Sequence, residues 1–291
     1  MMVLLFMNEF SAFVRIKTSS EMLVDTNVGS DMLKINMDIT MKRLPCMIAS
    51  VDSKDMMGSH SLNVQGRIIK KRLDKNGKVI GELIEVKGNN SHDEDRVVDY
   101  EEVRKAVQNE EGCQIVGNLE VLRVPGNFHI SSHAFGSIIA RLAAEGLYKF
   151  DISHTINHIS FGDESDIKKI RSNFNVGILN PIDGVSKIQQ KHKMYEYYLK
   201  VVPTSYTDVE GKTYNVHQFT ANNNEVETVM MVPTVYFRYD ISPILVKIVQ
   251  YRQAFFHFFI QICAIVGGMF TVMGIFDNLL HRLTKGASKS E

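Results

Sequence analysis

The middle of the chain alternates between apolar and polar residues. From Leu33 to Ile39 every second residue is apolar, and the residues between them are Lys34, Asn36 and Asp38. A period of two is typical of a β-strand that buries one face and exposes the other. Further strands are predicted over residues 67–74, 78–86, 114–124, 194–202, 212–220 and 234–239.

Turn signals separate these strands, and helical patterns are few. Asn76-Gly77 lies between two strands and predicts a tight hairpin turn, because both central positions of such a turn need a positive φ. Helical spacing of apolar residues occurs over 137–148 and over 100–108, a charged segment that we expect to be exposed. Strands joined by turns, with little strand–helix–strand alternation, predict a mainly β fold: an antiparallel β-sandwich with few short helices.

One long segment near the C-terminus has a different composition. Residues 254–276 contain no Asp, Glu, Lys or Arg. As a helix this segment would be about 34 Å long, enough to cross a hydrocarbon core of about 30 Å. We therefore predict a transmembrane helix over 254–276 and a short tail over 277–291. Three basic residues follow the segment and two closely precede it, which favours a cytosolic C-terminus.

Residues 1–14 are also apolar, but they are interrupted by Asn8 and Glu9 and are too short to span a bilayer. They lack the basic region and the small-residue cleavage site of a secretory signal peptide. We interpret them as the remnant of a first transmembrane helix whose beginning is truncated. The alternative is a frayed apolar end packed on the domain. Residues 15–250 then form a β-rich domain outside the membrane.

Small and polar residues line one side of the predicted transmembrane helix. These residues follow one another at intervals of three or four positions and therefore lie in a stripe along one side of a helix: His257, Gln261, Ala264, Gly268 and Thr271. Small residues let helix backbones approach closely, and polar side chains in hydrocarbon need hydrogen-bonding groups that lipid does not offer. The stripe predicts a packing seam for another transmembrane helix. Alternatively, His257 and Gln261 lie at the membrane interface.

Charge and cysteine content narrow the classes of function. With 33 basic and 33 acidic residues the chain has no excess charge for nucleic acid, so we expect no nucleic-acid binding. Cys263 lies in the apolar segment, which leaves Cys46 and Cys113 as a candidate disulfide or as two unconnected thiols. Asn89 begins an Asn-X-Ser sequon and is a candidate glycosylation site if the domain is lumenal.

The sequence carries no phosphate-binding loop, dinucleotide-binding glycine turn, nucleophile elbow, HExxH or CxxC motif. We therefore predict no catalytic residue, no metal ligand and no cofactor. Four histidines form two HxxxH pairs: His129, His133, His154 and His158. On a helix this spacing would suit zinc. Around residue 129 the chain reads as extended, which would put the first pair about 13 Å apart, with no obvious completing carboxylate.

Three interpretations of these histidines remain. Structural histidines are favoured, and a pH-responsive surface formed by His129, His154 and His158 comes next, because an unperturbed imidazole titrates near pH 6.5. A metal site is the least favoured.

The histidines lie in segments that resemble a known family. The strings GCQIVGNLEVLRVPGNFHIS (112–131) and SHTINHISFG (153–162) are similar to those of the ER–Golgi intermediate compartment proteins, which are ER-derived, COPII-coated vesicle membrane proteins. Further blocks occur in family order: EMLVDTN (21–27), INMDIT (35–40), LPC (44–46), IIKKRLDKNG (68–77), PTVYFRYDISPI (233–244) and CAIVGGMFTVMGIFD (263–277). Together they cover nearly the whole chain.

The resemblance implies a membrane protein with two transmembrane helices, short cytosolic ends and a large lumenal β-rich domain over residues 15–250. Such proteins cycle between the ER, the intermediate compartment and the Golgi in COPII and COPI vesicles. Members act in pairs as sorting or retrieval receptors. The implied partners are a paralogous subunit, lumenal cargo, the vesicle coats and membrane lipid. The last four residues contain one lysine, where the dilysine retrieval signal of some members has two.

A non-enzymatic receptor subunit is therefore the leading hypothesis. In this hypothesis the histidines trigger cargo release in the mildly acidic Golgi. The alternatives are a lumenal metal-dependent enzyme that uses His129, His133, His154 and His158, and a coat adaptor.

Overall fold

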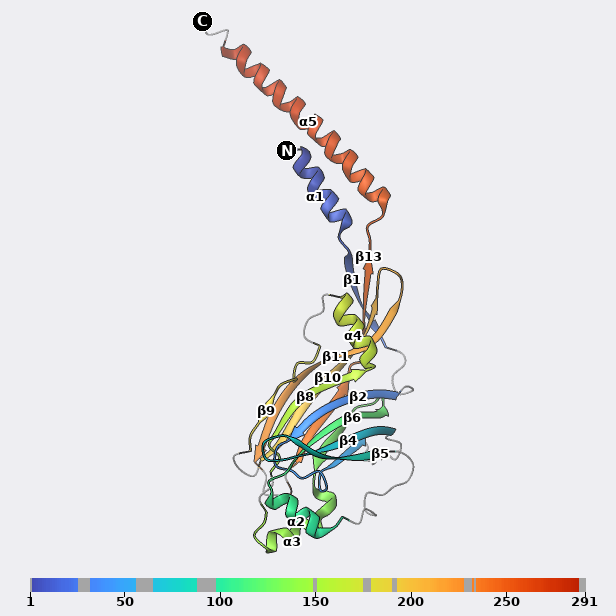
Figure 1. The fold of residues 1–291 in the computed structure, drawn as a ribbon. Coiled ribbons are helices and arrows are strands. Elements are labelled where there is room, and N and C mark those ends of the chain that lie inside the picture. Colours follow the sequence, from blue (N-terminus) through green and yellow to red (C-terminus); the bar gives the residue numbers. More distant parts are fainter. Residues whose placement is uncertain are drawn as a thin grey trace. The chain divides into compact units, whose positions relative to one another are not determined.

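The computed structural model describes residues 2–25, 32–55, 65–87, 98–148, 151–174, 179–189, 193–227, 232 and 234–287 (Figure 1). The chain divides into two compact units. The larger unit comprises residues 22–205 and 214–247, and the smaller one comprises residues 1–21, 206–213 and 248–291.

Strands dominate the larger unit, which confirms the predicted mainly β fold. Within the described residues thirteen strands form a single hydrogen-bonded sheet, with the main order β3-β7-β12-β10-β11-β8-β2-β6-β4-β5. The strands are β1 (Lys17–Val24), β2 (Met32–Met41), β3 (Ser50–Asp55), β4 (Gln65–Leu73), β5 (Val79–Lys87), β6 (Gly112–Leu122), β7 (Gly126–Ser131), β8 (His154–Gly162), β9 (Ser186–Lys187), β10 (Lys193–Thr207), β11 (Thr213–Glu227), β12 (Thr234–Ile241) and β13 (Ile244–Tyr251).

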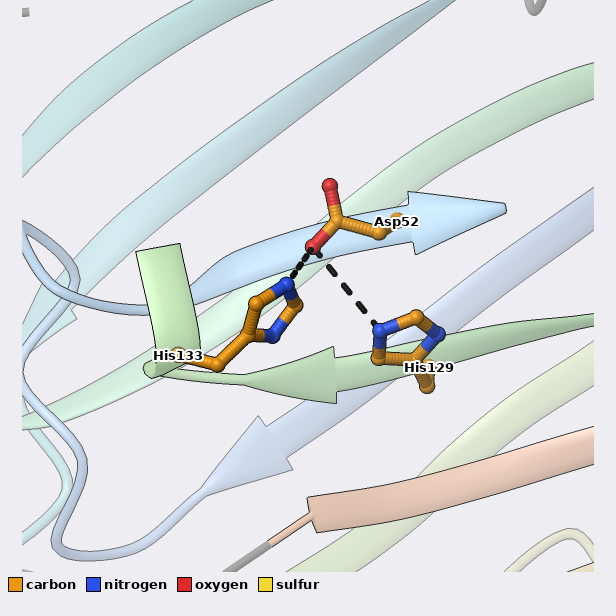
Figure 2. Close-up of side chains that lie close together, drawn as sticks. All are labelled: Asp52, His129 and His133. Atoms are coloured by element: carbon orange, nitrogen blue, oxygen red, sulfur yellow. Dashed lines mark ion pairs between the residues drawn. The ribbon is translucent and has the colours of Figure 1, made fainter. Parts of the chain in front are cut away.

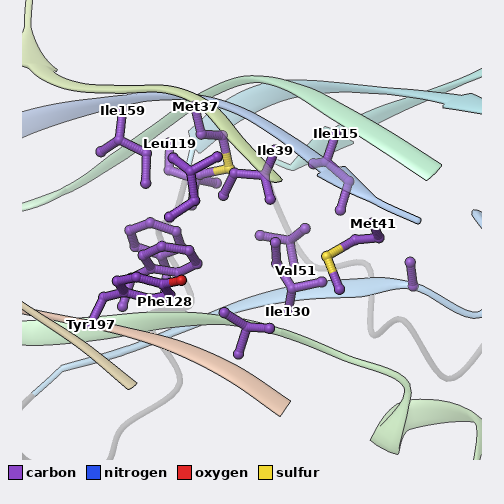
Figure 3. Close-up of a cluster of buried hydrophobic side chains, with 14 of the residues drawn as sticks. Met37, Ile39, Met41, Val51, Ile115, Leu119, Phe128, Ile130, Ile159 and Tyr197 are labelled. Carbon is purple, nitrogen blue, oxygen red and sulfur yellow. The ribbon is translucent and has the colours of Figure 1, made fainter. Parts of the chain in front are cut away.

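The sheet folds over on itself into two layers with the core between them. Figure 3 shows apolar side chains of β2, β6 and β8 facing those of β3, β7 and β10. In β2 the predicted alternation holds, since Leu33, Ile35, Met37 and Ile39 are buried. At the centre of the core the ring of Phe237 stacks on two buried rings, at centroid distances of 4.7 Å from Phe128 and 5.0 Å from Tyr197. Both inner faces thus contribute to one core.

A described strand pair departs from the antiparallel arrangement of the predicted sandwich. Strands β10 and β12 run parallel, with Tyr195 opposite Val235 and Val201 opposite Ile241. Strand β11 follows β10 in the chain and is its neighbour in the sheet. The chain therefore returns along β11 before it enters β12, and β12 lies on the other side of β10 in the same direction as β10. Alternation within a strand carries no information on the direction of its neighbour.

The hairpin predicted at Asn76-Gly77 is confirmed, but its turn is wider than expected. Strands β4 and β5 pair antiparallel, and Gly77 has a φ of +83°. Asn76 is not among the described residues with positive φ. The Asp74 carboxylate instead accepts hydrogen bonds from the backbone N–H groups of Asn76 and Lys78, both at 2.8 Å. A side-chain acceptor therefore closes the loop that the sequence assigned to a two-residue turn.

Among the described residues of the larger unit, helices are few and short. They are α2 (Tyr100–Gln108), the 3₁₀ turn η2 (His133–Phe135), α3 (Gly136–Ala144) and α4 (Glu164–Asn173). The predicted helices over 100–108 and 137–148 correspond to α2 and α3. Helix α2 is more buried than expected, because Val103, Ala106 and Val107 are buried and the two valines belong to the core. Helix α4 was not predicted, since Ile167 and Ile170 give it only a narrow apolar face.

The smaller unit contains the apolar helices α1 (Met2–Val14) and α5 (Phe255–Ala287). Within α5, Phe255–His281 is long and apolar enough to cross a membrane, so the apolar helix extends beyond the predicted 254–276. Helix α1 packs against the first turns of α5. The Phe13 ring stacks on Phe258 at a centroid distance of 4.4 Å, and Phe10 contacts the same ring at 6.3 Å.

Candidate functional site

The four histidines singled out by the sequence lie in three different environments. His129 and His133 come together beside Asp52, His154 is buried in the core, and His158 contacts Asp183. A single site made of all four histidines is therefore not formed, and the proposed enzyme that would use them together is not supported.

Asp52, His129 and His133 form what we call the Asp–His–His cluster (Figure 2). The Oδ2 atom of Asp52 lies 4.0 Å from Nε2 of His129 and 3.8 Å from Nε2 of His133. The two imidazole rings are stacked, with centroids 5.4 Å apart. The expected separation of about 13 Å is thus wrong, and so is the expectation that no carboxylate completes the group.

Local structure explains the cluster. Strand β7 ends at Ser131 and the turn η2 begins at His133, so the chain bends after His129 instead of continuing as a strand. Strand β3 pairs with β7, and the register puts Asp52 directly opposite His129. Sequence reasoning missed Asp52 because nothing in the segment around it indicates which strand is its neighbour.

His154 is a structural histidine. Its side chain is fully buried, with Nε2 2.7 Å from the Tyr197 hydroxyl and Nδ1 2.7 Å from the carbonyl oxygen of Ile152. Burial disfavours the charged imidazole and lowers the pKa of His154 to about 4. The prediction that His154 is pH-responsive between neutral and mildly acidic conditions is therefore wrong.

His154 and His217 should make the fold less stable at acidic pH. Burial, reinforced by Arg123, lowers the pKa of His217 to about 4 as well. Between pH 6.5 and 4 the unfolded chain binds more protons than the folded one, so the free energy of unfolding falls as the pH falls. From pH 7 to pH 5.5 we expect a loss of about 1 kcal/mol for each histidine, measurable by urea unfolding of the purified chain.

The variant His154→Gln should show roughly half of this pH dependence. Between pH 7 and pH 8 wild type and variant should both show almost none, because the histidines are then neutral in both states. An unchanged pH dependence in the variant would contradict the assignment.

His158 lies at the surface beside a carboxylate. Its Nδ1 atom is 2.8 Å from Oδ2 of Asp183, and its Nε2 atom is 3.0 Å from the Ser160 hydroxyl. Asn180 also approaches Nδ1, at 3.2 Å. About a third of each side chain of the His158–Asp183 pair is exposed. The backbone N–H of Ile159 donates to the other oxygen of Asp183, so the carboxylate is fixed against strand β8.

The two cysteine candidates of the β-rich domain are bonded to each other. The sulfurs of Cys46 and Cys113 form a disulfide whose cysteines are 67 residues apart in the sequence. Both residues are buried in the core. Asn89, the candidate glycosylation site, lies outside the described residues.

The stripe on α5 lies beside the surface that α1 covers. Helix α1 contacts Phe258, which is buried, whereas Ala264, Gly268 and Thr271 are exposed in the described structure. The polar residues of the stripe, His257 and Gln261, form hydrogen bonds with Gln253. The Gln253 amide nitrogen lies 2.9 Å from Nδ1 of His257 and donates a hydrogen bond to the Gln261 side-chain oxygen at 2.7 Å. Within the described residues α1 therefore does not cover the small residues of the stripe.

Comparisons with known proteins agree with this architecture. The family model described as "Endoplasmic reticulum vesicle transporter" matches residues 90–277, and the model described as "Endoplasmic Reticulum-Golgi Intermediate Compartment (ERGIC)" matches residues 1–62. The crystal structure of Erv41p is similar over 79% of this chain and 99% of that chain, with a TM-score of 0.50 and 21% identity. That likeness concerns the fold alone.

Two relatives match over almost the whole sequence. The probable endoplasmic reticulum-Golgi intermediate compartment protein 3 of Dictyostelium discoideum is 30% identical over 98% of this chain and 88% of that protein. The endoplasmic reticulum-Golgi intermediate compartment protein 1 of Xenopus laevis is 30% identical over 98% of this chain and 84% of that protein. With the apolar helix α5, these matches support a membrane protein of the early secretory pathway with a role in ER–Golgi transport. The chain belongs to the family of endoplasmic reticulum vesicle transporters and ER–Golgi intermediate compartment proteins.

Proposed function

We propose that this chain is a non-enzymatic subunit of a cargo-sorting or retrieval receptor that cycles between the ER and the Golgi in COPII and COPI vesicles. The observation that carries the proposal is the family match, which extends over the β-rich domain and the apolar helices together. In this proposal the β-rich domain binds lumenal cargo, and the short ends of the chain contact the vesicle coats.

In the proposed topology residues 15–250 are lumenal, residues 254–276 cross the membrane and residues 277–291 are cytosolic. The apolar residues 1–14 lie in the membrane beside 254–276. The Cys46–Cys113 disulfide supports a lumenal domain, because disulfides persist in oxidising compartments such as the ER lumen. A glycan on Asn89 is consistent with the same side of the membrane.

A paralogous subunit is the proposed partner within the membrane. The exposed small residues Ala264 and Gly268 support this, because helices in lipid associate through close backbone contact at small side chains. Gly274 is also exposed but lies six residues further along α5, about 240° around the helix axis. The two glycines therefore point in different directions, and they allow the same substitution to be compared at two positions around one helix.

Cargo release is proposed to depend on the His158–Asp183 pair. Protonation of His158 adds a positive charge beside Asp183 and changes the surface that cargo contacts. Asp38 of β2 is a further charged group, directly opposite His158 in the sheet, whereas Asn180 and Ser160 are uncharged. His154 takes no part in this proposal, because its imidazole stays neutral at mildly acidic pH.

The test is purification of the tagged full chain from membranes in mild detergent at pH 7.2, followed by identification of the bound proteins. A paralogue should co-purify in near-equal amounts. The variant Gly268→Leu should reduce the amount of co-purified paralogue about tenfold, because a bulky side chain at this position prevents close approach of the two helix backbones. The matched variant Gly274→Leu should retain the paralogue.

The same preparation tests cargo release. Washing at pH 6 should release lumenal proteins from the wild type, and the variant His158→Ala should retain them. The receptor proposal fails if neither a paralogue nor any lumenal protein co-purifies. If Gly268→Leu and Gly274→Leu behave alike, the stripe is not the contact surface.

A further inference from the structure

We propose that the Asp–His–His cluster binds one divalent transition-metal ion, with zinc the best match to its ligands. The ligand atoms are Oδ2 of Asp52 and the Nε2 atoms of His129 and His133, which point toward one another in Figure 2. This site does not depend on the cargo-receptor function proposed above.

The distances between the ligand atoms suit a small cation. One ligand atom from each of the three residues lies within 4.8 Å of the others, and the two nitrogen–oxygen distances are 4.0 and 3.8 Å. Zinc binds imidazole nitrogen at about 2.0–2.1 Å and carboxylate oxygen at about 2.0–2.2 Å in tetrahedral sites. Ligand atoms of such a site are about 3.4 Å apart, so each nitrogen–oxygen pair needs to close by only roughly 0.5 Å.

The protein holds two of the three ligands firmly. Asp52 and His129 are directly opposite each other in the β3–β7 ladder. The His129 side chain is buried, and its ring lies 5.0 Å from the Tyr236 ring and 5.4 Å from the His133 ring. A ligand pair fixed by strand pairing loses little further freedom when a metal binds.

His133 has the outer contact that a metal-binding histidine usually has. Its Nδ1 atom lies within hydrogen-bond reach of the Ser131 hydroxyl. When Nδ1 donates its proton to that oxygen, the lone pair of Nε2 faces Asp52, which is the form that binds a metal. His133 is also 45% exposed, so a metal ion held here keeps at least one coordination position open to water.

The ligand types select the metal. Two imidazoles and one carboxylate favour zinc and related transition metals, whereas calcium and magnesium prefer sites made entirely of oxygen atoms. The competing explanation is a protonated histidine paired with Asp52 and no metal. Direct measurement of bound metal distinguishes this ion pair from the proposed zinc site.

The test is metal analysis of the purified full chain. The protein is stripped with a chelator, titrated with zinc chloride at pH 7.5, and followed by calorimetry and by elemental analysis after gel filtration. Cobalt(II) provides a second probe, because its visible absorption reports a tetrahedral nitrogen–oxygen environment. We expect one zinc ion per chain and an increase in the temperature of unfolding on zinc addition.

Four variants assign the ion to the cluster. His133→Ala and Asp52→Asn should each weaken zinc binding by at least about 100-fold, and Ser131→Ala by about 10–100-fold. Asp163→Asn is the matched control: it removes a carboxylate from an exposed ion pair with Lys34 and should leave zinc binding unchanged. Circular dichroism at matched temperatures shows whether each variant is folded. Absence of stoichiometric zinc in the wild type, or equal affinity in folded His133→Ala, overturns the proposal.

Discussion

Replacing both Cys46 and Cys113 with alanine should lower the free energy of unfolding by about 4 kcal/mol. The disulfide closes a loop of 67 residues, and restricting a loop of that length in the unfolded chain stabilises the fold by about this amount. It also ties the segment after β2 to the beginning of β6, in a region where both cysteines are buried. Thermal or urea unfolding of the purified chain gives the measurement.

Two controls accompany this prediction. Cys263→Ala removes the exposed free thiol of α5 and should leave the stability of the β-rich domain unchanged. A reducing agent should destabilise the wild type about as much as the double substitution, and should have no effect on the double variant. Wild-type protein that is equally stable with and without reductant would show that the loop closure contributes nothing.

The substitution Phe237→Ala should destabilise the β-rich domain by about 3–5 kcal/mol, the usual cost of removing a buried aromatic ring. Phe237 is fully buried between two other rings, those of Phe128 and Tyr197. Its removal leaves a cavity between the two layers that neither neighbouring strand can fill without moving. Urea unfolding followed by circular dichroism measures the loss.

The matched control for this substitution is Tyr198→Ala. Tyr198 follows Tyr197 in β10, is 45% exposed and donates a hydrogen bond to Glu196 at 2.6 Å. Its removal should cost only about 1 kcal/mol, because a partly exposed ring and one hydrogen bond are lost without a buried cavity. Similar losses for both substitutions would mean that the two layers do not pack as tightly as the structure indicates. Phe237→Leu should lie between these variants, since it retains part of the buried volume.

Much of the fold follows from short-range pattern. The alternation in β2 and the turn after Asp74 are local properties, because a period of two assigns a residue to a face of the sheet and glycine accepts a positive φ. The parallel pairing of β10 with β12 could not be predicted this way, since the direction of a neighbouring strand depends on the path of the chain between them. Helix α4 was missed for a different reason: charged residues outnumber its two buried isoleucines.

The histidines show the same division. Their presence in segments resembling the family was evident from the sequence, but their environments were not. His154 and His158 are four residues apart in one strand, yet one is buried against Tyr197 and the other lies beside Asp183 at the surface. Strand β8 pairs with β2, and the register of this pair shifts after Asp38. The spacing of two residues within β8 therefore does not determine which residues their side chains contact.

By itself the sequence determined the mainly β fold, the apolar membrane helix, the choice of two cysteines for a disulfide and the family, because these depend on local pattern and on residue identity. Only the tertiary structure decided that Asp52 joins His129 and His133, and that the small residues of α5 lie outside the contact with α1. The physical reason is that strand register and the bend after Ser131 bring together residues distant in the chain, and no periodicity along a single strand contains that information.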